Sequence, residues 1–435
     1  MSPGQQFYQT LDEELAGTIA GASGFAEHVQ TAPVGLPENA FAQRTARLHA
    51  IRSFFRVTLQ IFRDVVAGKH SSDLAKLLLN DVPKNCGIEF HRELPNEVWT
   101  IPVFFRTDEA KDGRIFEIQC PGSGWGDLQL LLNAYARRGP SSVAISGYQP
   151  SRFVAEEVVR LCGKTDPSVL HLLDNASNPV SMRYLMATTQ PPLRYWGYEK
   201  SVRNAECNFV RSHSFFGLVA ENLFKSRIRG AAEGRVNFDL PPVLVFDQKI
   251  PLCLPFLAET KSLFTDSIRE ILAYSHPVTE NGFMDVNGEW VTCESFINRP
   301  ASQRRYFLKY AGCDVSVNWG SRSVYRLSDS KAVASNLLKV ATEDARQGRF
   351  WLIQPEISHK EMIIFFGKKD GTEIQAKWTA KYSCFYGPTR LIGIRTMHRN
   401  HPKVHGQEET VVGIAVPGYR QEPAPFEDSD VVRGK

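Results

Sequence analysis

The chain has 435 residues, of which 43% are hydrophobic and 23% charged, so it has the composition of an ordinary globular protein with room for two or three packed domains. The formal net charge of +4 gives no reason to expect nucleic acid as a partner, and no run of about 18 apolar residues predicts a membrane span. Eight scattered cysteines without a CxxC pair argue against a zinc ribbon and a disulfide scaffold. The first residues show no secretory signal pattern, and we expect a cytoplasmic protein.

The N-terminal part, residues 1–95, is predicted to be mostly helical. Residues 40–80 carry apolar side chains at a spacing of three to four, with basic residues between them. This pattern predicts an amphipathic helix that breaks at Gly68 and a second helix capped by Ser71 or Ser72. We interpret the pair as a helical layer that covers a core.

Residues 97–120 change to a strand pattern. Two apolar stretches, VWTIPVFFRT and RIFEIQC, are joined by the polar turn DEAKDG and followed by a glycine-rich segment and the helical pattern LQLLLNAYARR. Gly122, Gly124 and Gly126 do not have the GxGxxG spacing of a dinucleotide-binding turn, and no Lys-Ser or Lys-Thr follows them as in a Walker A loop. For Cys120 we expect a buried structural thiol.

The middle third, residues 151–298, alternates between helical and strand patterns, which predicts a doubly wound α/β domain with a parallel sheet. One of the predicted strands is VLVFDQ (243–248), and a helix is predicted to follow it. Ligands of such sheets bind beyond the carboxyl ends of the strands. Asp174, Asn175 and Asp247 follow strand patterns, so each is a candidate for substrate contact or for capping the next helix.

Positive charge gathers in the last third, where 22 Lys and Arg stand against 14 Asp and Glu from Arg299 onward. This favours a phosphate-rich small ligand. The histidines at 398, 401 and 405 lack a helical i,i+4 spacing, which favours a solvated loop over a metal site.

The same third begins with the strand pattern RRYFLKYAG, which contains Lys309. A small polar loop, a second strand, a helix preceded by Ser328 or Asp329 and ended at Gly348, and the strand 350–357 follow in order. A hairpin and two further strands extend to residue 418, and residues 419–435 have the composition of a loose tail.

Lys309 is the first chemical candidate. A lysine near the end of an apolar strand can reach a phosphate as a point charge, and the backbone N–H groups of the loop after it can cover the same phosphates. The strand that ends at Gln354–Ile357 breaks at Pro355, as an interdomain hinge does, and its backbone could contact an adenine. Glu356 could meet the ribose.

This order of elements resembles the ATP-grasp superfamily. The early position of the acid-x-amide strand FEIQCPG, almost 200 residues before the lysine strand, is similar to the circularly permuted branch that contains glutathionylspermidine synthetase and other peptide-forming ligases. The resemblance covers roughly residues 95–417. It implies an α/β fold in which residues 96–150 and 358–418 build the large ATP-grasp lobe, 151–298 a substrate-binding domain and 299–357 the small nucleotide-binding lobe.

The resemblance also implies roles for single residues. Glu117 and Gln119 take the places of the Mg²⁺ ligands, and Asp108 or Asp127 would have to supply the second acid, since Pro102 and Val103 cannot. Arg390 or Arg395 corresponds to the arginine that stabilises the transferring phosphate. The second nucleotide lysine has no clear counterpart, although Lys377 and Lys381 lie on a strand that could face the cleft. The implied nucleotide-binding residues are Lys309, Gly320, Ser321, Gln354, Pro355, Glu356, Ile357 and Lys377.

The implied activity is the ATP- and Mg²⁺-dependent joining of a small-molecule carboxylate, such as an amino acid or peptide, to an amine through an acyl phosphate. A homodimer is possible. The alternative is a protein of the same fold that binds a nucleotide without catalysis, because Gln119 replaces the usual Asn and the second acid is missing from its usual place.

Overall fold

The computed structural model describes most of the chain. The described residues are 3–19, 28–82, 84–110, 112–120, 123–137, 149–172, 179–196, 207–212, 214–220, 224–312, 314, 317, 323–357, 361–368, 370, 372–401 and 410–418. The predicted loop residues Gly320 and Ser321, and the predicted strand-end residues Asp174 and Asn175, lie outside them.

The largest sheet joins segments that are far apart in the sequence. Its strands run in the order β15-β1-β18-β17-β16-β3-β4, with β2 beside β18. The early hairpin β3–β4 therefore pairs with β16, from the last third of the chain. Both parts of the predicted large lobe thus contribute strands to one sheet. The strands are β1 (His28–Gln30), β2 (Val34–Leu36), β3 (Phe105–Glu109), β4 (Ile115–Gln119), β15 (Glu361–Lys368), β16 (Glu373–Tyr386), β17 (Leu391–Arg399) and β18 (Val411–Pro417).

One face of this sheet packs against the N-terminal helices. Phe55 of α3 contacts Phe105 edge to face at 5.0 Å, and Phe105 stacks on Tyr386 at 5.2 Å. The predicted helix break is confirmed: Gly68 has a φ of +74°, and the Ser71 side chain caps the next helix by accepting a hydrogen bond from Leu74 N. The elements are α2 (Glu38–Ala46), α3 (Leu48–Val66), α4 (Ser72–Leu78), η1 (Lys84–Cys86), α5 (Ile88–Arg92) and η2 (Asn96–Val98).

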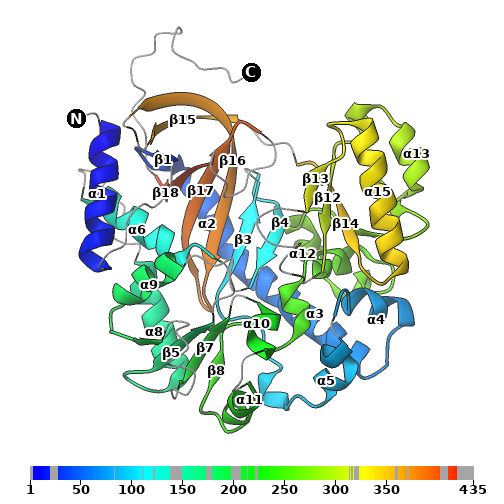
Figure 1. The fold of residues 1–435 in the computed structure, drawn as a ribbon, viewed down its shortest axis with the longest axis horizontal. Coiled ribbons are helices and arrows are strands. Elements are labelled where there is room, and N and C mark those ends of the chain that lie inside the picture. The colour runs from blue at the N-terminus through cyan, green and yellow to red at the C-terminus, as the bar shows by residue number, and fades with distance from the viewer. Residues whose placement is uncertain are drawn as a thin grey trace.

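The other face packs against the helix that follows β4. Trp125 at the start of this helix, α6, lies edge-on against Phe385 at 5.1 Å. Gly126 brings α6 so close to α9 that a Cβ there would overlap the backbone of Ser181. Figure 1 shows α1, α6 and α9 together beside the sheet. The helices are α1 (Pro3–Thr18), α6 (Trp125–Ala136), α8 (Pro150–Cys162) and α9 (Pro179–Ala187).

The predicted parallel sheet of the middle third is present. Its strands β6 (Arg194–Trp196), β5 (Ser168–Leu172), β7 (Phe209–Ser212) and β8 (Asn237–Phe238) are all parallel, in the order β6-β5-β7-β8. The helices α10 (Phe215–Val219) and α11 (Phe224–Ala232) follow β7.

The strand prediction for residues 243–248 was wrong. The segment forms the 3-10 helix η4 (Leu244–Asp247), followed by η5 (Ile250–Phe256), η6 (Lys261–Leu263) and the short helix α12 (Asp266–Ile271) in place of one long helix. Prolines at 241, 242, 251 and 255 remove backbone donors and prevent a regular strand or helix here. Asp247 instead accepts a hydrogen bond from Phe215 N at 2.7 Å, at the start of α10.

The small lobe is a separate antiparallel sheet of order β13-β12-β14-β9, covered by α15. Figure 1 shows it beside the β4 edge of the largest sheet. The cap of α15 is Ser330, two positions after Ser328, and Gly348 has the predicted left-handed conformation. The elements are β9 (His276–Val278), β10 (Phe283–Met284), β11 (Trp290–Val291), α13 (Cys293–Asn298), η7 (Ala301–Gln303), β12 (Tyr306–Tyr310), β13 (Val324–Arg326), α15 (Lys331–Arg346) and β14 (Trp351–Pro355). None of the described helices is long and apolar enough to cross a bilayer.

Candidate functional site

A row of charged side chains crosses one face of the largest sheet. Glu117 on β4 is paired with Asp108 on β3, Asp108 with Ser383 on β16, and Ser383 with Arg395 on β17. Directly paired residues project to the same side of a sheet, so these four side chains share one face. Arg106 and Lys381, two positions away on their strands, lie on it as well. We call this set the charged face.

Asp108 is the most strongly bound carboxylate of the charged face. It is 1% exposed and accepts hydrogen bonds from Lys381 Nζ and Ser383 Oγ, each at 2.8 Å, while Arg106 Nε lies 3.0 Å from it. Burial raises the pKa of Asp108, but the charges of Arg106 and Lys381 outweigh burial and hold the pKa well below its ordinary value. Of the two candidates for the second acid, Asp108 and Asp127, it is therefore Asp108 that lies directly beside Glu117 on the neighbouring strand.

The small lobe meets the charged face at Lys309. Its Nζ donates hydrogen bonds to Phe116 O at 3.1 Å and Gln354 Oε1 at 2.6 Å, and it lies 5.0 Å from the centre of the Phe116 ring. Lys309 is 5% exposed. Burial lowers its pKa from 10.5 to about 8, against the opposing charge of Glu117. The fold thus brings together the predicted lysine and the predicted acid, which are almost 200 residues apart.

Sequence reasoning missed a second buried lysine. Lys249 Nζ lies 3.7 Å from Glu117 Oε1, and the Lys249 backbone N–H donates to Ala311 O at the end of β12. It lies between η4, where a strand was wrongly predicted, and η5. The signal in the sequence was the position of Lys249 as the single cation in the apolar run LPPVLVFDQKIPLCLPF.

Arg395 closes the charged face on the side of α6. It is buried and donates to Asp127 Oδ2 at 2.6 Å, and its guanidinium contacts Gly124, where φ is +90°. A side chain at Gly124 would overlap Arg395 and would also be strained in this backbone conformation. Gly124 therefore makes room for Arg395. Asp127, the other candidate for the second acid, pairs with that arginine.

Two predicted residues lie away from the charged face. Arg390 is exposed in the turn between β16 and β17, with its guanidinium 4.3 Å from the centre of the Phe153 ring. Lys377 is exposed on β16 and lies 3.5 Å from Glu361. The structure does not bring either residue to Lys309, and Lys381 rather than Lys377 occupies the charged face.

The predicted hinge residues end β14. The Gln354 side chain bridges Lys309 and Ser275, whereas Glu356 is held by Arg305 and Arg326 at about 3 Å. The Glu356 backbone N–H donates to Arg305 O. Pro355 pairs with Tyr306 and Ile357 is buried. In this arrangement the carboxylate of Glu356 already has two cationic partners.

The charged face suits a polyphosphate better than a bare metal ion. Together with Lys249 and Lys309, the charged face gathers five cations around Glu117, Asp108 and Asp127, the partner of Arg395; the other cations are Lys381, Arg106 and Arg395. Within the described residues there is no group of three or more His, Cys, Asp and Glu that could hold a metal. Glu117 is partly exposed and lies on the same face as Gln119, so these two could hold Mg²⁺ only together with phosphate oxygens, as is usual for this ion.

The comparisons with known proteins support the fold. No family model matches the chain, and no curated protein matches it. Among solved structures, it is similar to a glutathione synthetase-like effector from Globodera pallida, with 11% identity, a TM-score of 0.56, and coverage of 95% of this chain and 97% of that one. A putative gamma-glutamylcysteine synthetase from Methylobacillus flagellatus KT matches with 12% identity, a TM-score of 0.38, and coverage of 81% and 86%. The first likeness shows the fold over nearly the whole length and confirms the predicted α/β, ATP-grasp-like class.

Proposed function

We propose that this protein is an ATP-dependent ligase that joins a small-molecule carboxylate to an amine. The observation that carries the proposal is the contact between Lys309 and Phe116 O, the residue before Glu117. It places a buried cation of the small lobe against the acidic strand of the large sheet. A nucleotide triphosphate that binds between the small lobe and the large sheet requires this arrangement.

In this proposal the triphosphate lies between Lys309 and Lys249 on one side and the charged face on the other. The two lysines neutralise phosphate oxygens as point charges. Both side chains are already buried, so binding does not require a further loss of hydration of their ammonium groups. Glu117 is the carboxylate best placed to hold Mg²⁺ with the phosphates, and this ion would supply further neutralisation of charge.

The reaction itself would be the activation of a carboxylate. Its oxygen attacks the γ-phosphorus, ADP leaves, and the acyl phosphate formed is attacked by an amine to give an amide and inorganic phosphate. Arg395 and Arg106 are the cations of the charged face that could stabilise negative charge in these two steps, and the pairing of Arg395 with Asp127 keeps its guanidinium oriented.

The proposal is tested by ATP consumption. Purified protein with Mg²⁺-ATP is incubated with pooled amino acids, short peptides and amines, and release of ADP and phosphate is followed. The proposal predicts release that requires both a carboxylate and an amine and that is lost in Glu117→Gln. Release at the background rate with every pool would contradict it.

A second candidate is a protein that binds a nucleotide without turning it over. The observation that favours it is Asp108, whose oxygens are already engaged by Arg106, Lys381 and Ser383. ATP raises the melting temperature under both candidates, since a ligand that binds only the folded state stabilises it, so ATP consumption is the measurement that separates them. Only the ligase also consumes ATP.

A further inference from the structure

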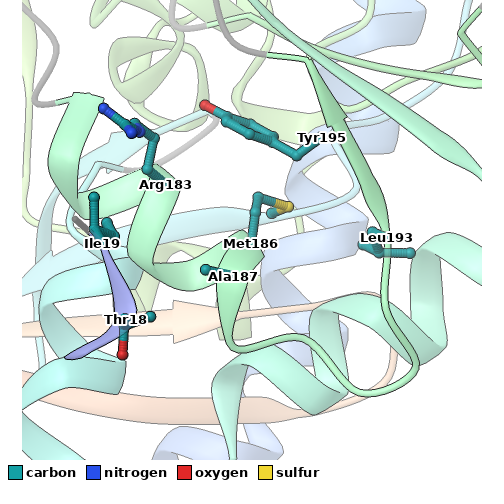
Figure 2. Close-up of a pocket in the computed structure, with 7 residues that line it drawn as sticks. All are labelled: Thr18, Ile19, Arg183, Met186, Ala187, Leu193 and Tyr195. Carbon is teal, nitrogen blue, oxygen red and sulfur yellow. The ribbon is translucent and has the colours of Figure 1, made fainter. Parts of the chain in front are cut away.

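A separate pocket of about 300 Å³ lies between the end of α1, helix α9 and the strand β6 (Figure 2). This volume is at the lower end of the range for small-molecule sites. None of the lining residues belongs to the charged face. They are Thr18, Ile19, Arg183, Met186, Ala187, Leu193 and Tyr195.

Most of the lining is apolar. Ile19, Met186 and Leu193 are buried and present their aliphatic side chains to the pocket, and Ala187 adds a methyl group. Such a lining favours the hydrocarbon part of a ligand, because the removal of CH₂ groups from water is favourable. The pocket is therefore unsuited to inorganic phosphate, which has no apolar part.

One end of the pocket is polar and cationic. Figure 2 shows the Tyr195 hydroxyl directed toward the side of the pocket where the guanidinium of Arg183 lies. Arg183 forms no ion pair with any residue that the structure describes. Its guanidinium can therefore bind an anion in a bidentate geometry without breaking an ion pair to a described residue.

The Tyr195 hydroxyl is held in place from behind. It is hydrogen bonded to His171 Nδ1 at 2.8 Å, and His171 is fully buried in β5. Burial raises the pKa of Tyr195, so the phenol keeps its proton at neutral pH. The oriented phenol and the guanidinium are complementary to a carboxylate, and an ammonium group would be repelled by Arg183.

We propose that this pocket binds a small carboxylate with an apolar body, its carboxylate held by Arg183 and Tyr195 and its hydrocarbon part by Ile19, Met186 and Leu193. The pocket is a second binding site, distinct from the charged face, and does not depend on the proposed ligase activity. Phenylacetate and hexanoate have the size and chemistry that it requires.

The test is a titration of the protein with phenylacetate and with hexanoate, followed by ligand-detected NMR. For ligands of about ten non-hydrogen atoms we expect a Kd on the order of 1 mM. Arg183→Gln should weaken binding about tenfold. Phenylacetamide should bind the wild type about tenfold more weakly than phenylacetate does. Its affinity should be the same for the wild type and for Arg183→Gln, and this comparison isolates the contribution of the charge pair.

Arg194→Gln is the matched control. Arg194 precedes Tyr195, is exposed, pairs with Asp166 and does not line the pocket, so its substitution should leave both affinities unchanged. Lys309→Ala should also leave them unchanged, which distinguishes this pocket from the charged face. Ala187→Trp, an exposed position on the lining, should abolish binding by filling the pocket. The inference is overturned if neither carboxylate binds below about 20 mM, or if Arg194→Gln weakens binding as much as Arg183→Gln.

Discussion

Asp108 and Glu109 are neighbours on β3, and their side chains lie on opposite faces of the largest sheet. Both are buried and both are paired with cations. Glu109 contacts Arg44 Nε at 3.0 Å and Arg47 at 3.5 Å and accepts a hydrogen bond from Thr107 at 2.8 Å. For Glu109, burial outweighs the charges of Arg44 and Arg47 and raises the pKa, whereas the pKa of Asp108 is lowered.

The difference lies in what surrounds each carboxylate. Around Glu109 the helices α2 and α3 and the apolar core close the space, with Arg44 placed 5.2 Å from the centre of the Tyr382 ring. Cations outnumber carboxylates around Asp108 as well, but here a second sheet meets the face and adds Lys309. A buried ion pair therefore does not by itself indicate a ligand site. A surplus of buried cations at the junction of two sheets is the feature that favours a ligand site.

The largest effect is expected at the closed pair. Glu109→Ala should lower the free energy of unfolding by about 3–5 kcal/mol, because Arg44 is left buried without its partner. Urea denaturation measures the change. Asp108→Ala should also destabilise the protein, but added ATP should stabilise this variant more than it stabilises the wild type, since Arg106 and Lys381 then gain an anion. Glu109→Ala should be stabilised by ATP only as much as the wild type, and an equal ATP effect in all three proteins would contradict the distinction between the two faces.

The second effect concerns turnover. Glu117→Gln keeps the size of the side chain and removes its charge, so ATP consumption should fall about 100-fold if this carboxylate holds the metal. ATP affinity measured without Mg²⁺ should be unchanged or stronger, because a negative charge beside Lys249 is gone. Steady-state kinetics and calorimetry give the two values. Undiminished turnover in the variant would remove Glu117 from the site.

The third effect separates two lysines of equal charge. Lys309→Ala should weaken ATP binding by about tenfold to 100-fold through the loss of a buried charge-assisted contact. Lys377→Ala, at an exposed position, should change it by less than about twofold. Isothermal titration of both variants with ATP shows whether the affinity for ATP depends on the buried lysine at the sheet junction or on positive charge in general.

The smallest effect is a proton exchange. Because the pKa of Lys309 is lowered to about 8, the free protein loses this charge as the pH rises through 8, and bound phosphates would restore it. ATP binding at pH 8.5 should therefore take up protons, and less so in Lys309→Arg. Calorimetry in two buffers of different ionisation enthalpy measures the uptake. The contribution of Lys309 to the stability of the ligand-free protein should rise between pH 8 and 10.5, since there this lysine is protonated in the unfolded chain and neutral in the folded one.

The sequence pattern predicted the parts of the fold that follow from local periodicity. The amphipathic helices and the strand containing Lys309 formed as expected, because their apolar spacing and caps agree with their tertiary contacts. The hairpin with Glu117 formed too, but its first strand is Phe105–Glu109 instead of residues 98–107, so Asp108 and Glu109 lie in the strand and not in the predicted turn. The segment around residue 247 did not form as expected, since its apolar run resembles a strand while its prolines exclude one. Lys249 was missed with it.

The partners of Asp108 could not be read from the sequence. Lys381 and Ser383 reach it only through the register between β3 and β16, which are separated by more than 260 residues. Lys377 and Lys381 project from the same face of β16, and only the position of β3 along that strand distinguishes the exposed one from the buried one. Pairings of this kind depend on tertiary structure, whereas the periodicity of a single strand does not report them.

The central claim is that a nucleotide triphosphate lies between the small lobe and the charged face. A crystal structure with Mg²⁺ and a non-hydrolysable ATP analogue tests it most directly. The account predicts phosphate oxygens within hydrogen-bond distance of Nζ of both Lys309 and Lys249, and the metal on Glu117. An analogue bound elsewhere, with Lys309 still donating to Phe116 O and Gln354, would contradict it.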